Sequence, residues 1–235
     1  MVTISAQFNG PDGSGNGGYV SGLLAQAHAT DRPVTATLRV PPPLGAPLTW
    51  EHAEGHTRLL THGGTVVGEA ADGEFVRDVP AAPTAEQVEQ GLAAYPGFRH
   101  HPFDRCFTCG TQRGDGDGLR LFTGPVGDDR VAGPFHAHEA FAEPDGTLGA
   151  PVAWAALDCP GGWAADFSEH VMVLGRMTAQ VVEPLVAGRT YASVGRLAER
   201  SGRKFLTDTA LYDDAGTLVG RAEQVWIEVD PARFA

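Results

Sequence analysis

The sequence is nearly devoid of lysine. Lys204 is the only lysine among 235 residues, and the 17 basic residues are outnumbered by 29 acidic ones. The resulting net charge of −12 leaves few clustered cations to bind phosphates, so we expect no nucleic-acid partner. No apolar run approaches the ~18 residues of a membrane-spanning helix, and the N-terminus lacks a basic region followed by a long apolar core. We therefore expect a cytoplasmic protein with no membrane partner.

Cysteine is also scarce. The chain holds three cysteines, an odd number that does not suit a disulfide framework and fits a reducing compartment. Hydrophobic residues make up 42% of the chain, which is enough for a substantial core in one large domain or two small ones.

The chain contains a weak internal repeat. VTATLRVPPPL at residues 34–44 resembles MTAQVVEPL at residues 177–185, and GGTVVGEA at residues 63–70 resembles AGTLVGRA at residues 215–222. Each segment alternates apolar and polar residues, as half-buried strands do. The two pairs occur in the same order, which indicates a duplication.

Each half also begins with a predicted helix. GNGGYVSGLLAQAHA starts at Gly15, and APVAWAALDCPGGWAA starts at Ala150. Four strand segments separated by turn signals follow the second helix and predict an antiparallel meander. The pattern of one helix and then several strands, occurring twice, predicts an α+β protein in which each sheet wraps its own helix.

A linker separates the halves. Residues 83–97 read PTAEQVEQGLAAYPG, and Thr84 with Gln87 forms a capping-box pattern that predicts a short helix ending at Pro96. We therefore predict an N-terminal repeat over residues 1–80, a linker over 81–105 and a C-terminal repeat over 106–235.

The second half resembles hotdog-fold thioesterases of the phenylacetyl-CoA type. CFTCGTQRGDGDGLRLF at residues 106–122 is similar to the CF-x-CG opening of that family, and GAPVAWAALDCPGGWAA is similar to its HGG-x-x-x-x-LLD-x-x-x-GWAA helix. The first half is more like the N-terminal repeat of double-hotdog acyl-CoA thioesterases. The resemblance implies a double hotdog, a pseudo-dimer of two repeats, that acts on acyl-CoA or a related thioester without a cofactor. It also places Asp158 on the catalytic acid of the family.

The two halves depart from the family pattern in opposite ways. Residues 149–151 (GAP) stand where the second half should read HGG, and Pro151 has no N–H to donate. Residues 16–18 (NGG) keep both glycines in the first half, but Ala25 stands in the place of the acid. One half therefore keeps the donors and the other keeps Asp158.

This division suggests one composite site. The resemblance implies that the helix start of one subunit meets the acid of the other. Backbone N–H groups at Gly17 and Gly18, beside Asn16, would bind the thioester carbonyl with the help of the helix dipole. Asp158 would act either as a general base on water or as a nucleophile, and the sequence does not distinguish these roles.

Structural explanations compete with these roles. A buried Asp158 can simply bind a neighbouring group, Gly17 and Gly18 can serve close packing, and Asn16 can cap a helix in either case. Two aromatic residues, Tyr19 and Trp163, belong either to the core or to the wall of the substrate pocket.

Metal binding is not expected. Cys106 and Cys109 form a single C-x-x-C pair with His100 and His101 just upstream, whereas structural zinc usually needs four ligands from two such pairs. The spacing of His52 with His56, and of His136 with His138, suits a shared face, but no cysteine or carboxylate completes either set.

The densest basic group lies in AERSGRKF. Arg200, Arg203 and Lys204 fall on a predicted turn, where they are either solvated or contact the phosphates of CoA.

Three functions follow from these observations. The leading one is hydrolysis of acyl-CoA or another acyl thioester, and the alternative is an acyl-thioester or small-lipid binding protein without turnover. A hotdog dehydratase or hydratase is less favoured, because Asp166 and His170 lie past the helix. The pseudo-dimer could stand alone or pair again as a homodimer.

Overall fold

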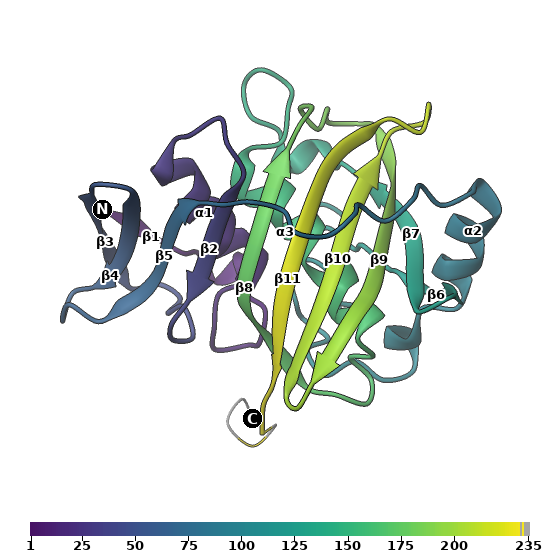
Figure 1. The fold of residues 1–235 in the computed structure, drawn as a ribbon, viewed down its shortest axis with the longest axis horizontal. Coiled ribbons are helices and arrows are strands. Elements are labelled where there is room, and N and C mark those ends of the chain that lie inside the picture. The colour runs from purple at the N-terminus through teal and green to yellow at the C-terminus, as the bar shows by residue number, and fades with distance from the viewer. Residues whose placement is uncertain (231, 233–235) are drawn as a thin grey trace.

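A computed structural model describes residues 1–230 and 232 of the chain. The described residues form three α-helices and one antiparallel sheet of 11 strands in the order β1-β3-β4-β5-β2-β8-β11-β10-β9-β7-β6 (Figure 1). The helices are α1 (Gly17–His28), α2 (Ala85–Ala93) and α3 (Ala150–Ala164). The strands are β1 (Val2–Thr3), β2 (Val34–Leu38), β3 (Pro47–Ala53), β4 (His56–Thr61), β5 (Val66–Asp72), β6 (Gly124–Gly127), β7 (Arg130–His136), β8 (Met172–Val181), β9 (Thr190–Ser201), β10 (Lys204–Tyr212) and β11 (Leu218–Glu228).

The two halves share one strand order, which confirms the predicted repeat. In each half the strand after the helix, β2 or β8, pairs with the last strand, β5 or β11, while the other strands form a meander. The predicted meander is therefore right for β9, β10 and β11 but wrong for β8, which lies beside β11 and not beside β9.

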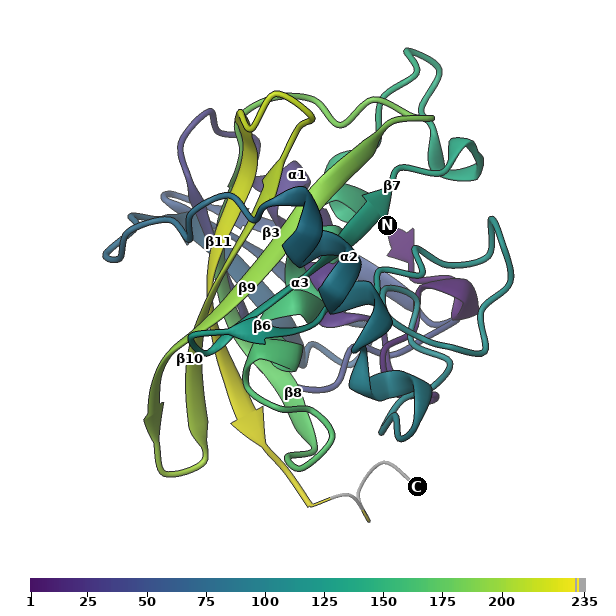
Figure 2. The ribbon, with the colours of Figure 1, turned by 90° about the vertical axis from the view of Figure 1, so that its right-hand side faces the viewer.

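The sheets of the two halves are joined. β2 pairs antiparallel with β8, with Val34 opposite Ala179 and Thr37 opposite Arg176. As predicted, each helix packs on the strands of its own repeat, α1 on β2, β4 and β5, and α3 on β9, β10 and β11. The two sheets continue into one curved sheet that encloses both helices (Figures 1 and 2). A shared sheet leaves no unpaired edge at the centre of the molecule.

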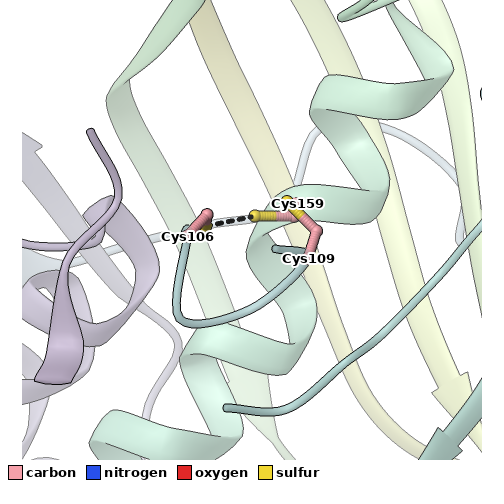
Figure 3. A group of neighbouring side chains, drawn as sticks. All are labelled: Cys106, Cys109 and Cys159. Carbon is pink, nitrogen blue, oxygen red and sulfur yellow. Dashed lines mark hydrogen bonds between the residues drawn. The ribbon is translucent and has the colours of Figure 1, made fainter. Parts of the chain in front are cut away.

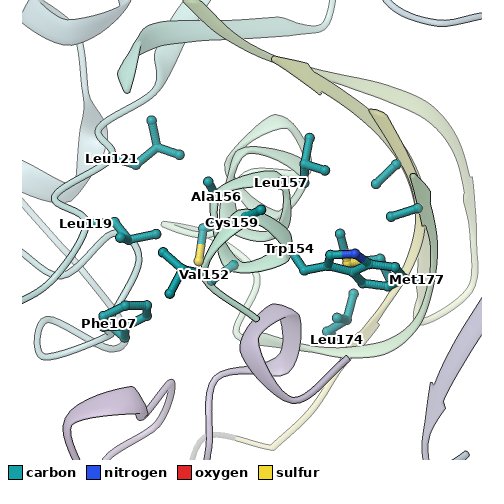
Figure 4. Close-up of a cluster of buried hydrophobic side chains, with 14 of the residues drawn as sticks. Phe107, Leu119, Leu121, Val152, Trp154, Ala156, Leu157, Cys159, Leu174 and Met177 are labelled. Atoms are coloured by element: carbon teal, nitrogen blue, oxygen red, sulfur yellow. The ribbon is translucent and has the colours of Figure 1, made fainter. Parts of the chain in front are cut away.

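The two long helices pack directly against each other. α3 is buried along most of its length. Trp154 and Leu157 face the sheet, and Val152 and Ala156 face the segment that carries Leu119 and Leu121 (Figure 4). Gly22 of α1 permits this approach, because a Cβ there would lie 2.5 Å from the Cα of Pro151. The helix starts and the middle turns of α1 and α3 are thereby brought together.

A strap crosses the outer face of the sheet. The chain between β5 and α2 runs over β8, β11, β10 and β9 (Figure 1). Arg77 and Arg196 both bind the buried carboxylate of Asp208, and Glu223 accepts hydrogen bonds from the N–H groups of Val76 and Arg77. These pairs fix the connection between the halves on the face opposite to α3.

The linker helix forms as its sequence predicts. Thr84 caps α2 and exchanges hydrogen bonds with Gln87 in a full capping box. The CF-x-CG segment at residues 106–110 forms a turn. Within the described part of the chain, no helix is both long and apolar enough to cross a membrane.

Candidate active site

The helix α3 presents one acid toward α1. Asp158 is 1% exposed, and its neighbours along the helix are apolar or small. Buried side chains from the sheet hold this turn of α3. Gln224 donates its Nε2 to the carbonyls of Leu157 (2.7 Å) and Asp158 (3.0 Å), and Thr209 donates its hydroxyl to Leu157 (2.7 Å). Pro160 lies inside the same helix and lacks an N–H, so these side chains stabilise a stretch where the helical bonding is incomplete.

The start of α1 faces this acid. Asn16 caps the helix through its Oδ1, which accepts the N–H of Tyr19 at 2.8 Å. The N–H of Gly18 is then free to point out of the helix, and it donates to Oδ2 of Asp158 at 2.8 Å. A Cβ at Gly18 would lie only 2.4 Å from the Cβ of Asp158, so glycine is required for this contact. The donor half and the acid half of the predicted site therefore meet.

The acid lies in an unfavourable environment for a charge. Burial raises the pKa of Asp158 to about 8, and the hydrogen bond from Gly18 opposes that rise. The nearby Cys106 raises the pKa further, and the side-chain amide of Asn16 lowers it. The second carboxyl oxygen, Oδ1, is buried and has no hydrogen-bond partner among the described residues. A group that binds Oδ1 would therefore remove an energetic penalty.

A cavity of about 290 Å³ adjoins this contact. Asn16, Gly17 and Asp158 line it together with apolar side chains from several elements. The apolar lining includes Leu38, Val40, Phe103, Phe167, Leu174 and Trp226. Two exposed cations, Arg39 and Arg203, line the same cavity, which places positive charge where it meets solvent. The site thus combines an apolar interior, a backbone donor, an acid and a basic rim.

The three cysteines also border the cavity. Cys106 and Cys109 lie on the turn before Gly110, and Cys159 follows Asp158 on α3 (Figure 3). The sulfurs of Cys106 and Cys159 are 3.8 Å apart, and Nδ2 of Asn16 donates to Cys106 at 3.6 Å. Hydrogen bonds from the other two thiols lower the pKa of Cys106, whereas burial raises the pKa of Cys109 and of Cys159.

The predicted substrate contacts are only partly brought to the cavity. Arg203 lines it, but Lys204 does not, and Arg200 instead stacks on Phe205 with 4.6 Å between the guanidinium carbon and the ring centre. Tyr19 stacks on Phe8, with 4.0 Å between the two ring centres, and does not line the cavity.

The remaining predicted residues lie elsewhere. Trp163 is buried among Tyr95, His101 and Phe167 and does not line the cavity. Asp166 and His170, considered for a dehydratase, are also outside it, and His170 binds Glu228 at 2.9 Å.

Sequence reasoning missed the residues that position the site. Gln224 is one of many polar residues on an alternating strand, and nothing local marks it as a partner of α3. Cys159 could have been noticed as the third of only three cysteines, but it lies 53 residues after Cys106, and only the fold brings them together.

The chain matches no protein-family model and no curated protein. Among solved structures it is similar to the tesB protein of Mycobacterium avium subspecies paratuberculosis, with a TM-score of 0.59 and 13% identity over 94% of this chain and 89% of that one. A thioesterase superfamily protein gives a TM-score of 0.43 and 17% identity over 47% of this chain and 57% of that one. The PaaI protein of E. coli, from the phenylacetic acid degradation operon, gives a TM-score of 0.44 and 10% identity over 48% of this chain and 81% of that one.

The full-length likeness settles the fold. Both repeats of this chain lie within the aligned part of the tesB protein, and the chain has the α+β double-hotdog fold that the sequence predicts. At 13% identity the likeness concerns the fold alone.

Proposed function

We propose that the protein hydrolyses acyl thioesters such as acyl-CoA at one composite site between its two repeats. A single observation carries the proposal: the Gly18 N–H at the start of one helix is 2.8 Å from the carboxyl oxygen of Asp158 on the other helix, beside a cavity. The tesB-like fold supports the proposal as an analogy.

The donor that now holds Asp158 is suited to hold a substrate carbonyl. When the thioester enters, its carbonyl oxygen would take the N–H of Gly18, with Gly17 next to it at the positive end of the α1 dipole. The negative charge that develops on that oxygen would be stabilised there. The carboxylate of Asp158, released from Gly18, would then lie beside the carbonyl carbon.

Two chemical routes remain open from that position. As a general base, Asp158 would take a proton from the attacking water, and the thiol would leave with that proton. As a nucleophile, it would form a mixed anhydride, expel the thiolate and be regenerated by water. Both routes convert one thioester and one water into one carboxylic acid and one thiol.

The cavity indicates how the substrate would be oriented. Its apolar lining suits the acyl group, while Arg203 at the rim suits a phosphate of CoA. Arg203 takes part in none of the ion pairs found among the described residues, whereas Arg39 is bound to Glu69. We therefore assign the phosphate contact to Arg203 rather than to Arg200 or Lys204. A cytoplasmic location agrees with acyl-CoA as the substrate and stays a prediction.

Binding without turnover is the second candidate, and one observation favours it. Asp158 is buried, its pKa is raised to about 8, and its hydrogen bond occupies the donor that a substrate needs. A protonated acid in that position neither attacks nor accepts a proton.

One experiment separates the two candidates. The reduced protein is incubated with acyl-CoA esters of short, long and aromatic acyl groups, and free CoA is quantified by chromatography while binding is followed by calorimetry. Hydrolysis predicts release of CoA in multiple turnovers for at least one ester. Saturable binding with no release above the uncatalysed rate contradicts hydrolysis and supports the binding protein.

A further inference from the structure

The three thiols of the chain converge although they come from separate segments. Cys106 and Cys109 belong to one turn, Cys159 belongs to α3, and each is at most 3% exposed. Their sulfur atoms all lie within 4.8 Å of one another (Figure 3). These are all the cysteines in the sequence. The proposed hydrolysis uses none of them.

The spacing suits a metal ion. Zinc–sulfur bonds are ~2.3 Å long, so two sulfurs of a tetrahedral site lie roughly 3.8 Å apart. Cys106 and Cys159 are separated by 3.8 Å. We propose that Cys106, Cys109 and Cys159 form a binding site for one thiophilic divalent cation, with Zn²⁺ as the expected ion.

The turn that carries two of the ligands is held rigidly. The carbonyl of Cys109 accepts hydrogen bonds from the Tyr95 hydroxyl at 2.8 Å and from Nε2 of His101 at 3.1 Å. Thr108, between the two cysteines, donates its hydroxyl to the Ala155 carbonyl of α3 at 3.2 Å. The sulfurs are therefore placed before any ion binds, which reduces the entropy lost on binding.

The fourth position opens toward the cavity. All three cysteines line the cavity, so a water molecule or a cavity ligand can complete a tetrahedron on that side. His101 is not counted as a ligand, because its Nδ1 accepts the N–H of Phe103 at 2.9 Å and its Nε2 faces Cys109. A bound ion would staple the turn to α3 at the residue that follows Asp158. The site thus goes beyond the proposed function while fixing the helix turn on which that function depends.

Cobalt titration tests the site directly. The protein is prepared with a non-thiol reductant, stripped with a chelator and titrated with Co²⁺ alone. We expect sulfur-to-cobalt charge-transfer absorption and the visible bands of tetrahedral cobalt, both saturating at one ion per chain and both abolished by Zn²⁺. Cys106→Ser, Cys109→Ser and Cys159→Ser should each weaken binding by at least about 100-fold. Thr111→Val, just after the same turn and with every thiol intact, should keep one ion per chain.

A second measurement covers the case in which a serine variant does not fold. The thiols of the unaltered protein are reacted with a disulfide reagent with and without Zn²⁺. Zinc should slow the reaction of all three thiols at least tenfold and raise the unfolding temperature. Absence of a tetrahedral cobalt spectrum in the reduced protein, or equal protection without Zn²⁺, overturns the proposal. A Cys106–Cys159 disulfide in protein isolated without air also overturns it. Neither measurement uses a thioester, so its outcome is independent of the hydrolysis proposal.

Discussion

The helices α1 and α3 occupy equivalent places in the two repeats but carry complementary residues. Ala25 and Asp158 each lie nine residues after the caps of their helices, Asn16 and Gly149. At the helix starts, Gly18 in α1 corresponds to Pro151 in α3. The pair Gly18 and Asp158 makes a 2.8 Å hydrogen bond, whereas the pair Pro151 and Ala25 has neither a donor nor an acid. In this fused pair of repeats, one of the two equivalent positions therefore has both a backbone donor and an acid, and the other has neither.

The repeats also differ in the length of their strands. The meander strands β9, β10 and β11 have 12, 9 and 11 residues, whereas β3, β4 and β5 have 7, 6 and 7. The longer strands supply Gln224 and Thr209, which hold the turn of α3 around Asp158. The C-terminal repeat therefore positions the acid, and the N-terminal repeat contributes the helix start.

Gly18→Ala should have the largest effect, because it disrupts the contact that distinguishes the pair Gly18 and Asp158 from the pair Pro151 and Ala25. The new methyl group would lie 2.4 Å from the Cβ of Asp158 and 2.8 Å from the Trp154 carbonyl, so the helices must separate and the donor must move. We expect thioester hydrolysis to fall by about 10²–10³-fold, as for loss of an oxyanion donor. Overpacking should also cost about 3 kcal/mol of unfolding free energy. Steady-state kinetics and denaturant unfolding measure both effects.

Gly13→Ala is the matched control, because a Cβ there would meet nothing within 4 Å. Equal activity of Gly18→Ala and Gly13→Ala would contradict the role of the Gly18 donor.

The rate of thioester hydrolysis should depend on pH through Asp158, the acid that only the C-terminal repeat carries. In metal-free protein, the raised pKa of Asp158, about 8, means that its carboxyl keeps a proton below that pH. Either chemical role needs the carboxylate, so the rate should rise roughly tenfold per pH unit and then level off above the pKa. Between pH 6 and pH 8 the increase should be about 50-fold. A rate that is constant over this range would contradict the assignment.

The stability of the fold should change with pH in the opposite direction. The folded state holds the Asp158 proton more tightly than the unfolded chain does, so this group lowers the free energy of unfolding as pH rises from about 4 to about 8. Asp158→Asn should lack that dependence, which denaturant melts at several pH values can measure.

Arg203→Ala should test the basic rim that β9 and β10 add to the C-terminal repeat. Loss of one phosphate contact should raise KM about tenfold and leave kcat within about twofold, because the side chain lies away from the reacting atoms. The adjacent Lys204→Ala, which removes a charge outside the cavity lining, should leave KM unchanged. Equal KM values for the two variants would remove Arg203 from the substrate contacts.

Pro151→Ala should have the smallest effect on hydrolysis, and this result would show that the start of α3 takes no part in the reaction. The substitution restores an N–H at the start of α3, but the opposite helix has Ala25 where an acid would be needed. We expect kcat/KM within about twofold of the parent and a change in stability below about 1 kcal/mol. A large gain or loss of activity would show that the second helix start takes part in the reaction.

The features that depend on short stretches of sequence were predicted correctly. The capping box at Thr84 and Gln87 gave the linker helix, and the matching strand motifs gave the repeat. Asp158 and Gly18 were found through the resemblance, and the structure brings them together as expected. The roles assigned to them stay predictions, as do the domain limits at residues 80 and 105.

Long-range pairing could not be predicted. Adjacent strands in the chain were expected to be adjacent in the sheet, but β8 pairs with β11 and β2 because the repeats share one sheet. For the same reason, the sequence could not show that Cys159 lies beside Cys106 and Cys109, or that Gln224 binds α3. Trp163 and Tyr19 were considered as pocket residues because they are aromatic. Residue type alone does not show whether an aromatic side chain faces the cavity or packs against other aromatic residues.

Asp158→Asn tests the central claim most directly. The amide keeps the shape of the carboxyl and can still accept the Gly18 N–H, so the fold should survive while the base or nucleophile is lost. Its control is Asp115→Asn, whose carboxyl is 86% exposed. The account predicts at least about 10³-fold slower release of CoA by Asp158→Asn, an unfolding temperature no lower than that of the parent, and full activity in the control. Parent-like turnover by a folded Asp158→Asn protein would contradict it.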